Sequence, residues 1–192
     1  MPTHVALLRG INLGGRNRVA MADLRALVAG LGHADVSTYI QSGNVLFSAP
    51  AGAPGTSAIA DEMTAAIASD LGVTAPVVVL TRDELADVVR ANPFPGESNH
   101  KCLHAVFRPG PADQDLLDRI TAAVSAATAK GSRDSAKSIG RTLYLHTPDG
   151  YGNSDLAKAL LRLTGTPQAG TGTARNWATV LRLLELSRDR TG

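Results

Sequence analysis

Apolar positions in the first part of the chain fall into two kinds of pattern. Short runs at 4–10 (HVALLRG), 36–41 (VSTYIQ), 44–48 (NVLFS) and 75–80 (APVVVL) predict strands. Stripes at helical spacing between these runs predict two helices, formed by Met21, Leu24, Leu27, Val28 and Leu31, then by Ile59, Met63, Ile67 and Leu71. The resulting order, strand–helix–strand–strand–helix–strand, is typical of a split βαβ (ferredoxin-like) unit.

The second part of the chain repeats this order of elements. A strand at 101–107 (KCLHAVF) precedes a helix opened by Pro111, and two strands (SAKSI, TLYLH) flank the turn Gly140-Arg141. A helix capped by Asn153 or Ser154 follows, then a short edge strand in TPQAGTG (166–172) and a helix from about residue 174 to 187. A similar two-residue turn, Ser42-Gly43, is expected in the first half.

These patterns predict an α+β fold of duplicated split βαβ (ferredoxin-like) units, with antiparallel sheets and helices packed on them. We expect a first unit at 1–80 and a second unit with a C-terminal helix at 101–192. Between them, TRDEL reads as a capping box of Thr81 with Glu84 that opens a helix, and the proline-rich ANPFPGESN ends it. Residues 81–100 are therefore expected to connect the two units.

Composition narrows the class of protein without naming a partner. The 192 residues are 44% hydrophobic and 19% charged, which is a globular profile, and the net charge is only +2. Aromatic residues make up 4%, which argues against an extended base-stacking surface. A single cysteine, no signal peptide and no long apolar segment predict a soluble cytoplasmic protein without membrane contact. The oligomeric state stays open, with a monomer favoured.

Glycine, asparagine and arginine gather between the first strand and the first helix, in LRGINLGGRNRVAM (8–21). Glycines in such a loop let successive backbone amides point into one concavity, and the following helix adds a partial positive charge of its own. Arginine forks suit phosphate and carboxylate groups. An anion site is one reading, and a tight connection with solvated arginines is the other; the residues concerned are Arg9, Gly10, Asn12, Gly14, Gly15, Arg16, Asn17 and Arg18.

Two further segments are candidates to lie beside this loop. Gln41, Ser42 and Asn44 surround the first hairpin turn, because the first and third strands are neighbours in a split βαβ sheet. Ordinary turn chemistry explains them equally well. Arg175 and Asn176 stand at the expected start of the last helix, where they either help to hold an anion or cap the helix.

Other reactive side chains give weaker signals. His100, Cys102 and His104 alternate along a predicted strand, but a fourth zinc ligand is not evident, so we expect no metal site and a buried, inert Cys102. Ser42 lacks a nucleophile elbow and an activating base. His146 reads as structural or exposed. No catalytic residue and no cofactor is therefore assigned.

The blocks ALLRGINLGGRNRVAMADLRALVAGLG and VSTYIQSGNVLFS closely resemble the opening of the bacterial family known as domain of unknown function 1697. TLYLHTPDGYGNSDLAKALL and TARNWATVLRLLEL continue the resemblance to the end of the chain. The family implies a duplicated ferredoxin-like fold and carries no established activity. The chain departs from it at Ala20, where the family has proline, and at Ala178, where it has asparagine.

Three functions remain in view after these arguments. The first is binding of a phosphorylated or otherwise anionic ligand, a nucleotide or a nucleic-acid backbone, at the opening loop. The second is an enzyme that acts on a small anionic substrate, which requires an acid, base or metal near the loop. The third is a protein-interaction module whose glycines serve only the turn, which an exposed apolar patch would favour.

Overall fold

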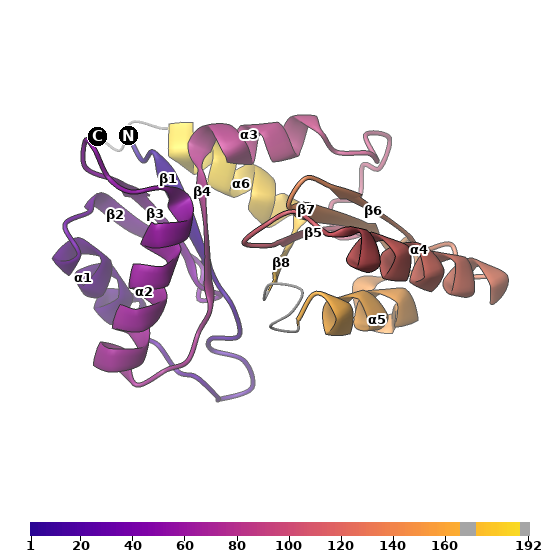
Figure 1. The fold of residues 1–192 in the computed structure, drawn as a ribbon, viewed down its shortest axis with the longest axis horizontal. Helices are drawn as coiled ribbons and strands as arrows, with labels where there is room; N and C mark the ends of the chain where they lie inside the picture. The colour runs from indigo at the N-terminus through magenta and orange to yellow at the C-terminus, as the bar shows by residue number, and fades with distance from the viewer. Residues whose placement is uncertain (166–171, 189–192) are drawn as a thin grey trace. The chain divides into compact units, whose positions relative to one another are not determined.

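The fold is that of a computed structural model, and the structure describes residues 1–165 and 172–188. Contacts divide it into two units, one running from Met1 to Asp87 together with the residues from Leu181 on, the other from Val88 to Val180. Each unit contains a four-stranded antiparallel sheet with two helices on one face (Figure 1). The segment boundaries that the sequence suggests at 80 and 100 stay a prediction.

The first unit follows the predicted order of elements. Its sheet has the strand order β2-β3-β1-β4, with β1 pairing antiparallel to both β3 and β4. The helix α3 leaves the end of β4. The elements are β1 (His4–Leu8), α1 (Met21–Gly30), β2 (Ala34–Tyr39), β3 (Asn44–Ser48), α2 (Thr56–Leu71), β4 (Val77–Thr81) and α3 (Arg82–Arg90), whose last three residues belong to the second unit.

The second unit repeats this topology with the strand order β6-β7-β5-β8. Two units of the same strand order fit the predicted duplication of a ferredoxin-like fold. The elements are β5 (Leu103–Phe107), α4 (Gln114–Ala129), β6 (Ser135–Ile139), β7 (Thr142–His146), the short 3-10 helix η1 (Tyr151–Asn153), α5 (Asp155–Leu163), β8 (Thr173–Asn176) and the start of α6 (Trp177–Arg188), whose residues from Leu181 on belong to the first unit.

A separate apolar core lies between sheet and helices in each unit. In the first, Ala6 and Leu8 of β1 meet Leu24 of α1 and Ile59 of α2, and the predicted helical stripes face this core. In the second, Val106 of β5 belongs to the corresponding cluster under α4 and α5. Phe47 is fully buried, and Trp177 is 4% exposed, as expected of core residues.

Side-chain caps fix where several helices begin. Thr81 Oγ1 accepts from the Glu84 amide at 3.1 Å while Glu84 Oε2 accepts from the Thr81 amide at 2.8 Å, which confirms the predicted capping box. Ser154, not Asn153, caps α5. The start of α4 was expected at Pro111, and this is wrong: Asp113 accepts from the Leu116 amide, and α4 begins at Gln114.

Two further expectations need correction. The first hairpin turn is not two residues long, because Tyr39 pairs with Asn44 and leaves residues 40–43 in the turn. The last helix starts at Trp177 rather than near residue 174, because Thr173–Asn176 pairs with β5 as the edge strand β8. The edge strand expected in TPQAGTG falls on residues 166–171, which lie outside the described residues, and on Gly172, which precedes β8.

Candidate functional site

The opening loop of the first unit folds into a small hairpin of its own. The amide of Asn12 donates to the Asn17 carbonyl at 3.0 Å, and the amide of Arg16 donates to the Leu13 carbonyl at 3.0 Å. Gly14 and Gly15 form the tip with φ of 54° and 79°, a pair of left-handed conformations that glycine adopts at little cost. The predicted backbone freedom is therefore used to reverse the chain.

Asn12 joins this loop to the β2–β3 turn. Its Nδ2 donates to the Val19 carbonyl at 3.0 Å and to the Gln41 carbonyl at 2.9 Å, while its Oδ1 accepts from the Val19 amide at 2.9 Å. We call the two joined segments, residues 9–20 and 40–44, the double loop. The expectation that the hairpin turn lies beside the opening loop is confirmed by this bridge.

The polar side chains of the β2–β3 turn mainly form hydrogen bonds within the turn itself. Asn44 is fully buried, and its Nδ2 donates to the Tyr39 carbonyl and to Ser42 Oγ, each at 3.0 Å. Gly43 has φ of 77°, and a Cβ at this position would lie 2.7 Å from Cβ of Leu8. The turn therefore needs glycine both for its backbone angle and for its close approach to β1.

Asn17 and Gly10 also have defined structural roles. Asn17 Nδ2 donates to the Gly10 carbonyl at 3.1 Å, and both residues adopt positive φ, 49° and 71° respectively. The Arg9 amide donates at 2.9 Å to the carbonyl of Pro76, the residue before β4, which holds the start of the loop beside the start of that strand. Asn12 and Asn17 are both among the residues of the predicted anion site, and in the structure their side-chain amides donate to backbone carbonyls of the first unit.

Arg16 and Arg18 are exposed, and neither forms a hydrogen bond or ion pair through its side chain within residues 1–165 and 172–188. The exposed amides of Gly14 and Gly15 likewise have no partner in that part of the chain. Two residues after Arg18, Ala20 occupies the N-cap of α1 without a side-chain cap. The first amides of α1 are thus left to solvent or to a ligand.

Arg175 and Asn176 belong to the second unit, so the double loop is described without them. Arg175 is 8% exposed, its Nη1 donates to Thr173 Oγ1 and to the Ala174 carbonyl at 2.8 Å, and burial lowers its pKa to about 10. Asn176 Oδ1 accepts from the Thr179 amide at 2.8 Å and caps α6. Of the two roles left open for these residues, capping is the one that Asn176 fills.

The alternating His100, Cys102 and His104 do not assemble a metal site. Cys102 is 7% exposed and its Sγ donates weakly to the Pro148 carbonyl at 3.8 Å. His104 stacks on Tyr151 with ring centroids 3.8 Å apart, and burial lowers its pKa to about 4. Among the residues that the structure describes, no group of three or more His, Cys, Asp or Glu side chains could hold a metal ion.

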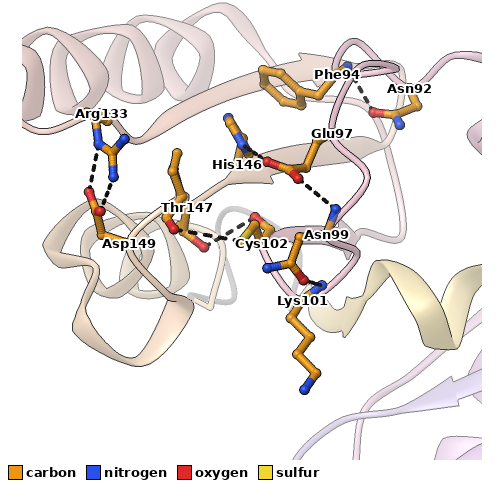
Figure 2. Close-up of polar contacts among 11 residues, drawn as sticks. Asn92, Phe94, Glu97, Asn99, Lys101, Cys102, Arg133, His146, Thr147 and Asp149 are labelled. Atoms are coloured by element: carbon orange, nitrogen blue, oxygen red, sulfur yellow. Dashed lines mark hydrogen bonds and ion pairs between the residues drawn. The ribbon is translucent and has the colours of Figure 1, made fainter.

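The sequence patterns did not predict one polar cluster of the second unit. His146 Nε2 lies 2.8 Å from Glu97 Oε2, and both side chains are about one-fifth exposed (Figure 2). The Asn99 amide donates to Glu97 Oε1 at 2.7 Å; this bond, followed by the contact with His146, lowers the pKa of Glu97. Phe94 packs on the His146 ring with centroids 5.3 Å apart. The pair fastens the connecting segment to β7.

None of the helices within the described ranges is both long enough and apolar enough to cross a bilayer.

Comparison with known proteins places the chain in a family but assigns no activity. A solved structure titled "The structure of conserved bacterial protein SP0830 from Streptococcus pneumoniae" is similar over 97% of this chain and 99% of that one, with 21% identity and a TM-score of 0.71. At this identity the likeness concerns the fold. No curated protein matches the chain. Residues 1–144 match the family described as "Protein of unknown function (DUF1697)", and the chain belongs to that family.

Proposed function

We propose that the double loop binds a phosphorylated ligand, a nucleotide or the backbone of a nucleic acid. The observation that carries this proposal is the pair Arg16 and Arg18, exposed and without an ion-pair partner in the described residues, just before the uncapped start of α1. Guanidinium groups bind phosphate through paired, charge-assisted hydrogen bonds. An uncapped helix start contributes about 0.3–1 kcal/mol toward an anion.

The charge balance of the double loop supports the same ligand class. Residues 9–20 and 40–44 contain Arg9, Arg16 and Arg18 and no acidic residue. The nearest carboxylate along the chain is Asp23, in the first turn of α1. The hydrogen bonds of Asn12 already order the backbone of the loop, so binding of an anion costs little conformational entropy there.

Phosphate contact has a characteristic dependence on salt. Each neutralised phosphate contributes roughly 0.7–0.9 to the slope of log affinity against log salt, so loss of both arginines reduces the slope by about 1.5. The probes are a fluorescein-labelled single-stranded oligonucleotide and a series of mononucleotides, titrated at 50 to 200 mM salt. Arg16→Ala with Arg18→Ala is compared with Arg162→Ala, which removes an exposed arginine from α5 of the second unit.

A second variant tests the helix start independently of the arginines. Ala20→Asp supplies the missing cap, which stabilises α1 by about 1 kcal/mol, and places a carboxylate where the anion would bind. We expect this variant to melt at a higher temperature and to bind the oligonucleotide more weakly. Unchanged affinity and salt slope in the arginine double variant would refute the proposal.

One observation favours a protein-interaction module as the second candidate. Leu13 and Ile40 are 64% and 50% exposed, and each is a chain neighbour of a residue in the Asn12–Gln41 bridge. Large apolar side chains held out on an ordered loop are typical of an interaction surface. Replacing both residues with serine separates the two functions, since phosphate binding should persist while binding of an apolar protein surface should not.

A further inference from the structure

A shallow groove lies between α4 and β6 in the second unit, apart from the double loop. Four apolar residues line it, Leu117, Ile120 and Val124 of α4 and Ala136 of β6, and four polar ones lie among them, Thr121, Ser125, Lys137 and Ser138. The cavity volume is about 280 Å³. A space of this size accepts a few small side chains rather than a whole helix.

The wall formed by β6 is an open sheet edge. In the order β6-β7-β5-β8 only one side of β6 is paired, and its register with β7 is continuous from Ser135 to Ile139. Ile139 and Thr142 flank the two-residue turn and form a hydrogen-bonded pair, so the backbone groups of Ala136 and Ser138 point outward. These groups have no partner among the described residues.

The equivalent edge of the first unit is obstructed. β2 shifts register between Ala34 and Ser37, and Asp35 lies there with φ of 52°. The Asp35 carboxylate is held by Ser48 Oγ at 2.7 Å and by the N-terminal ammonium at 3.2 Å. Bulges and charges of this kind protect an edge from strand addition. Of the two duplicated edges, β6 alone is regular along its described length.

Charge decides which kind of strand can be added. Lys137 is the one charged residue among those lining the groove, and as the central residue of β6 it is exposed. Antiparallel pairing of β6 with a second copy about this residue would set two lysines opposite each other, which is unfavourable. The same position attracts a carboxylate from a strand of different sequence.

We propose that the α4–β6 groove binds an extended acidic segment of a partner protein, which adds to the sheet as an antiparallel strand beside β6. The segment alternates apolar and acidic residues. Two small apolar side chains face α4 opposite Ala136 and Ser138, and the acidic residue between them lies opposite Lys137 on the other face of the sheet. This surface is independent of the phosphate site proposed above.

The register of the added strand makes the proposal testable with one short peptide. The probe is the peptide Ser-Val-Glu-Val-Ser with blocked ends and a fluorophore. Its binding to the full chain is measured by fluorescence anisotropy. In the proposed register the two valine amides bond to β6 and the glutamate amide points away. N-methylation of the valines should abolish binding, whereas N-methylation of the glutamate should preserve it. A peptide of the same composition with adjacent valines serves as the sequence control.

Protein variants test the other side of the interface. Lys137→Glu should weaken the glutamate peptide by about fivefold and should favour a peptide with lysine in its place. Lys130→Glu, at the end of α4, is the matched control. Ser138→Pro removes an outward amide that forms no hydrogen bond to β7, so the fold should persist while peptide binding is lost.

Three results would overturn the inference. The first is equal binding of the alternating peptide and its rearranged control, and the second is equal loss on N-methylation of valine and of glutamate. The third is self-association of the chain at high concentration that Ser138→Pro removes, because it would assign this edge to a second copy.

Discussion

Asn12 holds the double loop together, and its replacement tests the geometry described above. Asn12→Ala removes three hydrogen bonds, to the Val19 carbonyl and amide and to the Gln41 carbonyl. At about 1 kcal/mol for each bond, this loss destabilises the first unit by about 3 kcal/mol. The backbone φ of 54° adds about 1 kcal/mol, because alanine tolerates the left-handed region less well than asparagine.

A series of substitutions separates these two contributions. Asn12→Gly loses the same bonds but tolerates the backbone angle, so it should be about 1 kcal/mol less destabilising than Asn12→Ala. Asn12→Asp keeps the acceptor for the Val19 amide and loses both donated bonds. Asn17→Ala is the control within the same loop: it carries a similar backbone cost, at φ of 49°, but removes one side-chain bond, to the Gly10 carbonyl, instead of three.

The assay combines a global and a local measurement. Urea unfolding followed by circular dichroism gives the free energy of unfolding, and NMR hydrogen exchange at the Val19 amide reports whether its acceptor is present. We expect Asn12→Ala to lose exchange protection at Val19 and Asn17→Ala to retain it. The reasoning fails if Asn12→Ala costs less than about 1 kcal/mol or leaves the Val19 amide protected.

Two further predictions follow from strained or buried groups. Ile40 is half exposed at φ of 50°, a costly conformation for a residue with a Cβ. Ile40→Gly should therefore be about 1 kcal/mol more stable than Ile40→Ala in urea titrations, and equal stability of the two variants would contradict the assigned strain. Burial lowers the pKa of His104 from its ordinary value of 6.5 to about 4 in the fold, so the unfolded chain takes up the proton first as the pH falls below 6.5. The free energy of unfolding should therefore fall between pH 6.5 and 4, by at most about 3 kcal/mol and by less where water screens the ring. His104→Phe, which keeps an aromatic ring beside Tyr151, should flatten this part of the pH profile, and an unchanged slope would exclude His104 as its cause.

Local periodicity was enough to predict most of the fold. The run HVALL and the stripe containing Leu24 and Val28 both belong to buried elements of the first unit. They could be predicted because the spacing of apolar residues determines which face of a strand or helix is buried. The turn Gly140-Arg141 was placed correctly for the same kind of reason: one glycine and two flanking strands identify it. The same rules failed at β8, where Arg175 interrupts any apolar pattern and pairing with β5 decides the conformation.

The candidate site was predictable in its residue types but not in its contacts. Asn12 was singled out, yet its partner Gln41 is 29 residues away, and no local pattern encodes that bond. The pair of Glu97 with His146 spans 49 residues and was missed for the same reason. Local sequence limits which side chains are present, whereas the sheet topology decides which of them meet.

The duplication of the fold offers an internal comparison for the proposed phosphate site. The connection from the first strand to the first helix of each unit occupies an equivalent place, and in the second unit Asp113 closes it with a carboxylate cap on the Leu116 amide. In the first unit the cap position is Ala20, and Arg16 and Arg18 precede it. Arg108, at the start of the second connection, is buried and interacts electrostatically with Asp113, so the second helix start already has its anion within the chain. The proposal therefore expects an external anion at the uncapped helix start of the first unit and none at that of the second.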